Sequence, residues 1–381
     1  MFNRRNFLIA GSVGAAALVA RPRLAFAKAA TDKRFLFIIQ RGAADGLATL
    51  GATGDPAYAG LRGDLAAGLT AGAKLDPMFT LHPALAETAK LYAARQALFV
   101  HAVASPYRDR SHFDGQNVLE SGAAGAYRLK DGWMNRLVGQ LPGGEKAIAL
   151  SPAVPLALRG PNPVESYASS ALPDAGDDLM LRAGDLYAGD AQLGPLWNQA
   201  LAARAKAGDL TDGKGGVAVG ALAARLMSGP DGARIGMIET NGWDTHSGQN
   251  GRLAAQLKGL DAMIAAYRSG LGAAWNDTLI LVATEFGRTA KANGTGGTDH
   301  GTGAMAMMLG GAVAGGRVIA DWPGLSAGAL YEGRDLKPTT DLDALVAGAL
   351  AQHFALDPAR AMAALFPESR GSAVAQKLIA A

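Results

Sequence analysis

The chain has 381 residues, no cysteine and a formal net charge of +3. The lack of cysteine excludes disulfides and thiolate metal sites, so any metal ion must bind histidine, carboxylate or hydroxyl ligands. The small net charge, without a run of lysine or arginine, gives no electrostatic reason to bind nucleic acid.

The first 27 residues have the pattern of a twin-arginine (Tat) export signal. Arg4 and Arg5 precede a weakly apolar stretch at 9–20, which is shorter than the about 20 residues needed to span a bilayer. Residues 25–27 then form a small-x-small cleavage site, Ala-Phe-Ala. A membrane anchor and a general secretory signal fit the paired arginines less well. We therefore predict export by the Tat translocase to the periplasm or beyond, with no membrane span in the mature chain.

Removal of this segment changes the charge of the protein. It contains four arginines and no acidic residue, so cleavage changes the formal charge from +3 to −1. The basic character of the full chain therefore belongs mainly to the export signal, and the mature protein is close to neutral.

Apolar runs in the mature chain predict the strands of a mostly parallel sheet. Continuous runs lie at 35–39, 97–103 and 278–284, and the second and third follow helical stretches. Strands without polar alternation are typical of a sheet covered on both faces. Shorter candidates lie at 147–150, 235–239 and 318–320. Alternation of strands and helices predicts one α/β domain over 28–381, with helices on both faces of the sheet.

The middle of the chain is predicted to form an inserted cap region at about 123–230. It contains a segment rich in alanine, glycine, aspartate and proline, with helices expected near 195–207 and 217–226. Closer to the C-terminus, a helix over 341–354 is expected, with Thr340 as its N-cap.

Acidic and imidazole side chains follow the predicted strands or lie in glycine-rich loops. Ligands bind beyond the carboxyl ends of the strands in such sheets, so these residues are candidates for a site. Carboxylates and imidazoles together form the ligand set of a divalent metal ion. The candidate metal ligands are Asp45, His112, Asp244, His246, Glu285, Asp299 and His300.

Each candidate also has a structural interpretation. Asp45 could cap a helix or hold a turn, and Asp244 with His246 could order their own loop. Glu285 could pair with Arg288 three residues later. Of the other histidines, His82 and His353 are predicted to be structural or surface residues, and His101 is predicted to be buried within a strand.

Ser111 precedes a predicted helix over 112–120 and has two compatible interpretations. One is an ordinary N-cap serine. The other is a nucleophile at a helix N-terminus, where backbone N–H groups favour a bound anion. Nearby arginines, Arg110 and Arg288 among them, would neutralise the oxygens of that anion.

Five segments in this order resemble the exported family called domain of unknown function 1501. The resemblance runs from about residue 34 to residue 366. The segments are Arg41-Gly42-Ala43-Ala44-Asp45-Gly46-Leu47, Ser111-His112-Phe113-Asp114, Gly242-Trp243-Asp244-Thr245-His246, Thr284-Glu285-Phe286-Gly287-Arg288 and Gly297-Thr298-Asp299-His300-Gly301.

That family is similar to the alkaline phosphatase superfamily, which includes sulfatases. The resemblance implies an alkaline-phosphatase-like fold, one or two divalent ions such as Zn or Mn, and a serine nucleophile at Ser111. It also implies that Asp45 binds one metal, that Asp244 and His246 bind a second, and that His300 is the last histidine ligand.

One departure from the superfamily pattern concerns its Asp-His pair. Here that pair is Glu285-Phe286, so one imidazole ligand is missing. His112 could replace it, or one metal site could be lost. The spacing of Asp244 and His246 is also shorter than usual.

Two functions from different classes follow from these patterns. The first is an exported, metal-dependent hydrolase of small phosphate or sulfate esters, with Ser111 as nucleophile. The second is a non-catalytic metal- or anion-binding accessory protein of the cell envelope on the same fold.

Overall fold

The computed structural model describes residues 31–143, 145–168, 177–207 and 215–380. The predicted export signal, residues 1–27, lies outside the described residues. Within the described part, no helix combines the length and the apolar character needed to cross a bilayer.

A nine-stranded sheet forms the centre of the molecule, with the order β11-β5-β10-β9-β1-β8-β6-β7 and with β12 also paired to β5. β10 runs antiparallel to β5 and β9, whereas the other pairs described in this sheet are parallel. The strands are β1 (Arg34–Gln40), β5 (Ala97–Ala104), β6 (Ala147–Ala149), β7 (Val164–Ser166), β8 (Ile235–Thr240), β9 (Thr278–Ala283), β10 (Ala304–Leu309), β11 (Arg317–Ile319) and β12 (Thr340–Asp341). The predicted α/β class with a mostly parallel sheet is confirmed.

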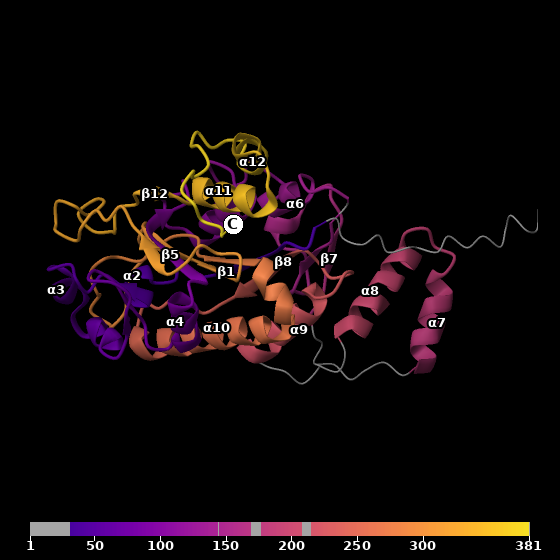
Figure 1. Ribbon diagram of the computed structural model, residues 1–381, viewed down its shortest axis with the longest axis horizontal. Helices are drawn as coiled ribbons and strands as arrows, with labels where there is room; N and C mark the ends of the chain where they lie inside the picture. Colours follow the sequence, from indigo (N-terminus) through magenta and orange to yellow (C-terminus); the bar gives the residue numbers. More distant parts are fainter. Residues whose placement is uncertain (1–30, 144, 169–176, 208–214, 381) are drawn as a thin grey trace, which may run out of the picture.

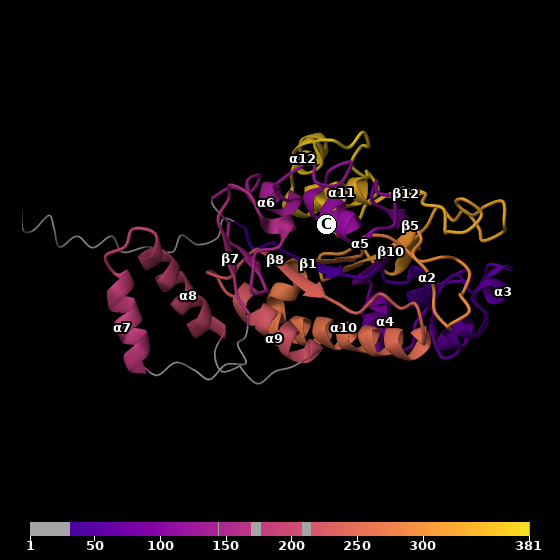
Figure 2. The ribbon, with the colours of Figure 1, turned by 180° about the vertical axis from the view of Figure 1, so that it is seen from behind.

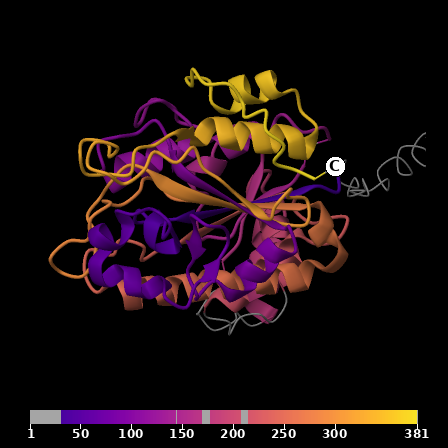
Figure 3. The same ribbon diagram turned by 60° about the vertical axis from the view of Figure 1, so that its left-hand side comes forward.

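Helices cover both faces of this sheet (Figures 1 and 3). α4, α9 and α10 pack on one face, and α5, α6, α11 and α12 pack on the other. These helices are α4 (Ala86–Ala93), α5 (His112–Ser121), α6 (Trp133–Val138), α9 (Gly216–Met227), α10 (Gln249–Leu271), α11 (Leu342–Phe354) and α12 (Pro358–Leu365).

The position of β1 between two layers of helices explains why this strand is apolar throughout. Leu36 and Ile38 join the core beneath α9 and α10, whereas Phe35, Phe37 and Ile39 join the core beneath α6 and α11. Successive side chains of a strand point to opposite faces, so a sheet covered on both sides needs apolar residues at every position.

Shorter elements complete the fold, most of them in the segment that follows β1. A three-stranded sheet has the order β2-β4-β3. Its strands and the neighbouring helices are β2 (Leu50–Gly51), β3 (Ala73–Lys74), β4 (Thr80–Leu81), α2 (Gly46–Thr49), α3 (Tyr58–Arg62) and η1 (Gly63–Leu69). Two further 3-10 helices are η2 (Leu156–Leu158) and η4 (Gly272–Asp277).

Several elements within the predicted insertion at 123–230 pack with the central sheet. β6 and β7 extend the central sheet, and α6 and α9 pack against its two faces. Of the described residues in this segment, α7 (Asp177–Tyr187) and α8 (Leu193–Ala207) stand away from the sheet at one end of the molecule (Figures 1 and 2). β6 overlaps the strand candidate at 147–150, whereas β7, with the sequence Val-Glu-Ser, has no apolar run and no counterpart among the predicted strands.

The predicted helices are otherwise close to the observed ones. α8 and α9 match the helices expected near 195–207 and 217–226. The expected N-cap of α11 is wrong by one residue: Asp341, not Thr340, accepts hydrogen bonds from the backbone N–H groups of Asp343 and Ala344. A carboxylate at this position also interacts favourably with the positive end of the helix dipole.

Candidate functional site

The predicted site residues come from loops at one edge of the central sheet. The loops after β1, β5, β8 and β9 begin at this edge because these strands are parallel. β10 is antiparallel to β9, so the residues that precede it, including His300, lie at the same edge. The sheet topology therefore gathers segments that are far apart in sequence.

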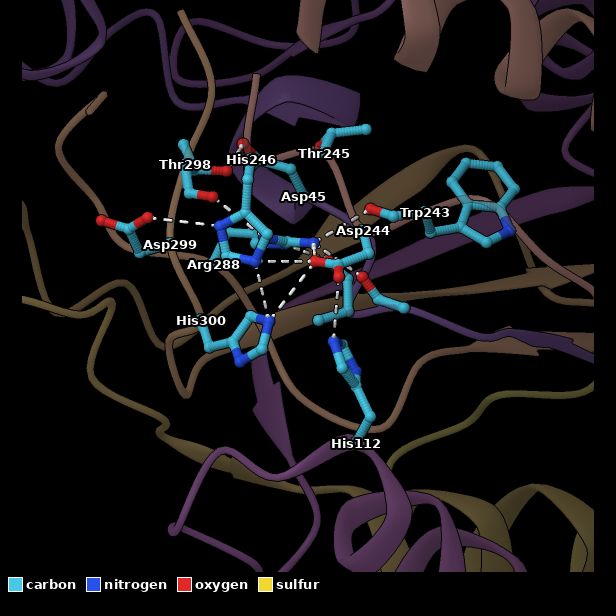
Figure 4. A network of polar contacts seen from close by, with 12 residues as sticks. Asp45, His112, Trp243, Asp244, Thr245, His246, Arg288, Thr298, Asp299 and His300 are labelled. Atoms are coloured by element: carbon cyan, nitrogen blue, oxygen red, sulfur yellow. Dashed lines mark hydrogen bonds and ion pairs between the residues drawn. The ribbon is translucent and has the colours of Figure 1, made fainter. Parts of the chain in front are cut away.

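Three imidazoles surround the carboxylate of Asp244 (Figure 4). Asp244 Oδ1 lies 3.0 Å from His246 Nε2 and 3.3 Å from His300 Nε2, and Asp244 Oδ2 lies 3.4 Å from His112 Nε2. His246 Nε2 and His300 Nε2 are themselves 3.0 Å apart. We call His112, Asp244, His246 and His300 the open cluster, because the side chain of Asp244 is 43% exposed.

The other ring nitrogen of each histidine is held by an oxygen acceptor. His112 Nδ1 lies 2.8 Å from Glu285 Oε1, and His246 Nδ1 lies 3.3 Å from Asp299 Oδ1. His300 Nδ1 donates to the backbone carbonyl of Arg110 at 3.0 Å. A ring that donates through Nδ1 presents an unprotonated Nε2 when neutral, which is how metal-binding histidines are commonly oriented.

The ring nitrogens and carboxylate oxygens of the open cluster therefore outnumber the protons available to form hydrogen bonds between them. The Nε2 atoms of His246 and His300 face each other, and His112 Nε2 is buried without a hydrogen-bond partner. Nitrogen and carboxylate atoms of His112, Asp244 and His300 all lie within 4.8 Å of one another. Such a set of imidazoles and one carboxylate suits a divalent ion such as Zn or Mn. The residues present therefore fit a metal ion.

Charge and burial around the open cluster decide the protonation states of its carboxylate and imidazoles. Burial would raise the pKa of Asp244, but Arg288 outweighs it and holds that pKa below its ordinary value. Burial lowers the pKa of His300 and so favours the neutral ring. The hydrogen bond to Glu285 raises the pKa of His112, so a metal ion at this ring competes with a proton.

Glu285, predicted as a metal ligand, instead holds His112 in place. It is 1% exposed, and its Oε1 accepts hydrogen bonds from Gly42 N at 2.8 Å and Gln116 Nε2 at 3.1 Å as well as from His112. Phe286 stacks on the ring of His112, with 5.1 Å between the ring centroids. Glu285 and Phe286 together hold the ring of His112 in the open cluster.

Asp45, also predicted as a metal ligand, lies apart from the converging nitrogen atoms. Its Oδ1 caps α2 by accepting from Ala48 N at 3.0 Å. Its Oδ2 pairs with Arg62 and accepts from Gln249 Nε2 at 2.6 Å. Burial would raise the pKa of Asp45, but Arg62 and these hydrogen bonds hold it below its ordinary value. In this structure the cation bound by Asp45 is a guanidinium.

Asp299 reaches the cluster through His246. Its carboxylate accepts from Asn293 Nδ2 at 3.2 Å and contacts His246 Nδ1, while its side chain is 58% exposed. The geometry gives Asp299 the task of orienting a histidine, from a more exposed position than Glu285 has.

Ser111 occupies the N-cap position of α5 without making the N-cap hydrogen bond. Its side chain accepts no bond from the helix. The residue before it, Arg110, has a positive φ of 61°, and its carbonyl binds His300. The residue after it, His112, belongs to the open cluster. Ser111 is therefore flanked by two residues that contact the cluster, and a left-handed non-glycine residue beside a site is often functional.

The two predicted anion-binding arginines are occupied by protein groups. Arg110 forms ion pairs with Asp335 at 2.8 Å and with Glu332 at 2.5 Å. Arg288 has a fully buried side chain. It donates to the carbonyls of Ala43, Gly42, Trp243 and Thr298, and it pairs with Asp244. Arg288 thus positions Asp244, and direct contact of either arginine with a substrate stays a prediction.

Three residues that connect these loops were not predicted from the sequence. Arg62, Gln249 and Thr298 are buried and hydrogen-bonded among themselves through Asp45. Thr298 adjoins Asp299 and His300, a position that could have drawn notice. Arg62 and Gln249 lie in helical stretches without any local pattern, so only the folded chain identifies them.

Comparison with known proteins finds a family model that matches most of the chain, and solved structures with weak similarity to it. A family model described as "Protein of unknown function (DUF1501)" matches residues 32–366. No curated protein matches the chain. Among solved structures, the phosphonate monoester hydrolase of Agrobacterium radiobacter is similar over 73% of this chain and 68% of its own, with 10% identity and a TM-score of 0.27. A similarity at that level says nothing about the activity of this chain.

Proposed function

The chain belongs to the family described as "Protein of unknown function (DUF1501)", and we propose that it is an exported, metal-dependent hydrolase of phosphate or sulfate esters. One observation carries the proposal. Three imidazoles whose Nδ1 atoms are already engaged surround one carboxylate, and Ser111, whose side chain caps no helix N–H group, lies in the chain between Arg110 and His112, which contact this set.

His112, Asp244, His246 and His300 would hold the ion. A bound divalent ion would lower the pKa of a nearby hydroxyl and neutralise charge on a substrate oxygen. Glu285, Asp299 and the carbonyl of Arg110 keep the three rings turned toward the site. Such outer contacts commonly change metal affinity by 10–100-fold, on the order found in other metalloproteins.

Ser111 would act as the nucleophile. Its Oγ forms a bond to phosphorus or sulfur, the ester oxygen leaves with its electron pair, and the hydroxyl proton ends on the departing alcohol. Water then cleaves the seryl ester and restores the hydroxyl. The backbone N–H groups of the first turn of α5 favour the anionic part of the substrate at this position.

We infer export from residues 1–27. Paired Arg4 and Arg5, a short apolar stretch and the site at 25–27 support it. Replacement of both arginines by lysine is expected to keep the protein in the cytoplasm, whereas the parent chain appears outside it with a new N-terminus after Ala27. Equal export of the two forms would contradict Tat transport.

The catalytic proposal is tested with purified protein, whose metal content is measured by elemental analysis. We expect bound Zn or Mn and metal-dependent turnover of an aryl phosphate or an aryl sulfate. Ser111→Ala should abolish turnover and retain the metal.

Ser269→Ala is the matched control for this variant. Ser269 is exposed near the far end of α10, which begins at the site and rises about 1.5 Å per residue, so it lies about 30 Å away. Equal activity of Ser111→Ala and Ser269→Ala would contradict the nucleophile.

A non-catalytic metal- or anion-binding protein is the second candidate, and the engaged arginines favour its metal-binding form over a hydrolase of anionic esters. Arg110 pairs with Asp335 and Glu332, and Arg288 is buried, so neither side chain is directed at an incoming anion. Bound metal without turnover of any phosphate or sulfate ester in a panel would support this function over the hydrolase.

A further inference from the structure

A second group of polar side chains lies behind the open cluster and is closed to solvent. Its members are each no more than 1% exposed, and we call them the closed cluster: Asp45, Arg62, Thr245, Gln249 and Thr298. Buried polar groups cost free energy unless they are paired, and a satisfied network holds its members in one arrangement. The closed cluster is therefore suited to fixing the chain segments that it joins.

Gln249 joins the two loops that carry histidines. Its Oε1 accepts hydrogen bonds from Thr245 Oγ1 at 3.0 Å and from Thr298 Oγ1 at 2.7 Å. Thr245 directly precedes His246, and Thr298 is two residues before His300. One amide oxygen thus sets the spacing between the histidine pair whose Nε2 atoms are 3.0 Å apart.

The same two loops are also in direct backbone contact. Thr298 N donates to Thr245 O at 3.3 Å. A Cβ atom at Gly297 would lie 2.3 Å from the backbone carbon of His246, so only glycine allows this approach. The side-chain link through Gln249 therefore acts on loops that already touch.

Asp45 anchors Gln249 from the other side. Its Oδ2 accepts from Gln249 Nε2 at 2.6 Å and pairs with Arg62, and its Oδ1 caps α2. Arg62 Nη1 also lies 3.3 Å from the carbonyl of Thr289. Both oxygens of Asp45 are thus engaged, and the positive charge beside this carboxylate belongs to the chain itself.

We propose that the closed cluster positions the two histidine loops for a single divalent ion, and that Asp45 binds Arg62 in place of a second ion. This inference rests on the metal site of the proposed function. Asp45, Gln249 and Thr298 are positioning residues in it, because they act through His246 and His300.

The test is a titration of the metal-depleted protein with Zn or Mn alone, with binding measured by isothermal titration calorimetry. We expect one equivalent in the wild type. Thr298→Val removes the hydroxyl at nearly constant volume and should weaken binding by about 10–100-fold, as loss of an outer contact does. Thr298→Ser keeps the hydroxyl and should bind as the wild type does.

Unfolding midpoints with and without the metal separate positioning from general stability. A merely structural role would lower both midpoints and leave the stabilisation by metal unchanged, whereas a positioning role reduces that stabilisation. Thr245→Val tests the same link from the other loop if Thr298→Val does not fold.

The outcomes distinguish this inference from the proposed function. Two equivalents in the wild type, or unchanged affinity in the valine variants, would overturn the inference and leave the metal site standing. No bound ion in the wild type would contradict the proposed function itself, and the inference with it.

Discussion

The open and closed clusters lie at the same edge of the sheet and differ in their exposure and in the partners of their carboxylates. In the closed cluster, Asp45 binds Arg62 and both of its oxygens are engaged. In the open cluster, the side chains of Asp244 and His246 are 43% and 45% exposed, and three Nε2 atoms face one carboxylate. The pairing within the closed cluster stabilises the fold, whereas the surplus of electron pairs in the open cluster prepares it to bind a cation.

The largest expected effect is on the free energy of unfolding, when the ion pair of the closed cluster is removed. Asp45→Asn leaves the buried charge of Arg62 without its partner, and loss of one member of a buried pair costs about 3–5 kcal/mol. Urea unfolding of the metal-free protein measures it. Asp64→Asn, at an exposed position nearby, is the control and should change little. A loss below about 1 kcal/mol for Asp45→Asn would contradict the structural role of the pair.

A smaller effect, on metal affinity, is expected when Glu285 is replaced, because this buried residue contacts His112 of the open cluster. Glu285→Gln weakens the hold on His112 Nδ1, so affinity for Zn or Mn should fall by about 10–100-fold. Isothermal titration gives the affinity, with Glu87→Gln as control because Glu87 is partly exposed and pairs with Lys90. Unchanged affinity would mean that the Glu285–His112 contact does not orient a ligand.

A pH dependence of stability should arise next to the closed cluster. Burial lowers the pKa of His101 to about 4. The folded protein keeps this ring neutral while the unfolded chain takes up a proton below about pH 6.5, so stability falls as the pH drops from about 6.5 to about 4.

His101→Gln removes this titration. The unfolding free energy of the variant relative to the wild type should therefore rise by about 1.4 kcal/mol for each pH unit below 6.5. Urea unfolding at pH 7, 6 and 5 checks the slope. A difference that stays flat across this range would show that His101 does not remain neutral in the folded protein.

The smallest effect is expected at Asp299. Its side chain is 58% exposed, so its contact with His246 is screened by water and is worth about 0.2–1 kcal/mol. Asp299→Asn should weaken metal binding by no more than about fivefold, measured in the same titration as Glu285→Gln. A loss of affinity as large as that of Glu285→Gln would contradict the expectation that the buried Glu285–His112 contact is stronger than the exposed Asp299–His246 contact.

The sequence was sufficient for the parts of the fold that rest on local patterns. The apolar runs that became β1, β5 and β9 were recognised because buried parallel strands need apolar residues at every position. The helix predicted over 112–120 corresponds to α5 (His112–Ser121), which ends at Gly122 in the left-handed conformation typical of a helix C-terminus. β10, with alternating alanine and methionine, and β7, with the sequence Val-Glu-Ser, were not among the predicted strands, whereas β6 overlaps the candidate at 147–150.

The sequence by itself also determined which segments supply the site, because carboxylates and imidazoles follow the strands. Only the tertiary structure decided what each of them does. Asp45 and Glu285 have the same ligand chemistry as Asp244, yet one meets Arg62 and the other meets His112. Those partners come from other helices, 17 and 173 residues away in sequence, and such a contact has no local signature. Packing of the chain therefore gave chemically similar side chains different partners.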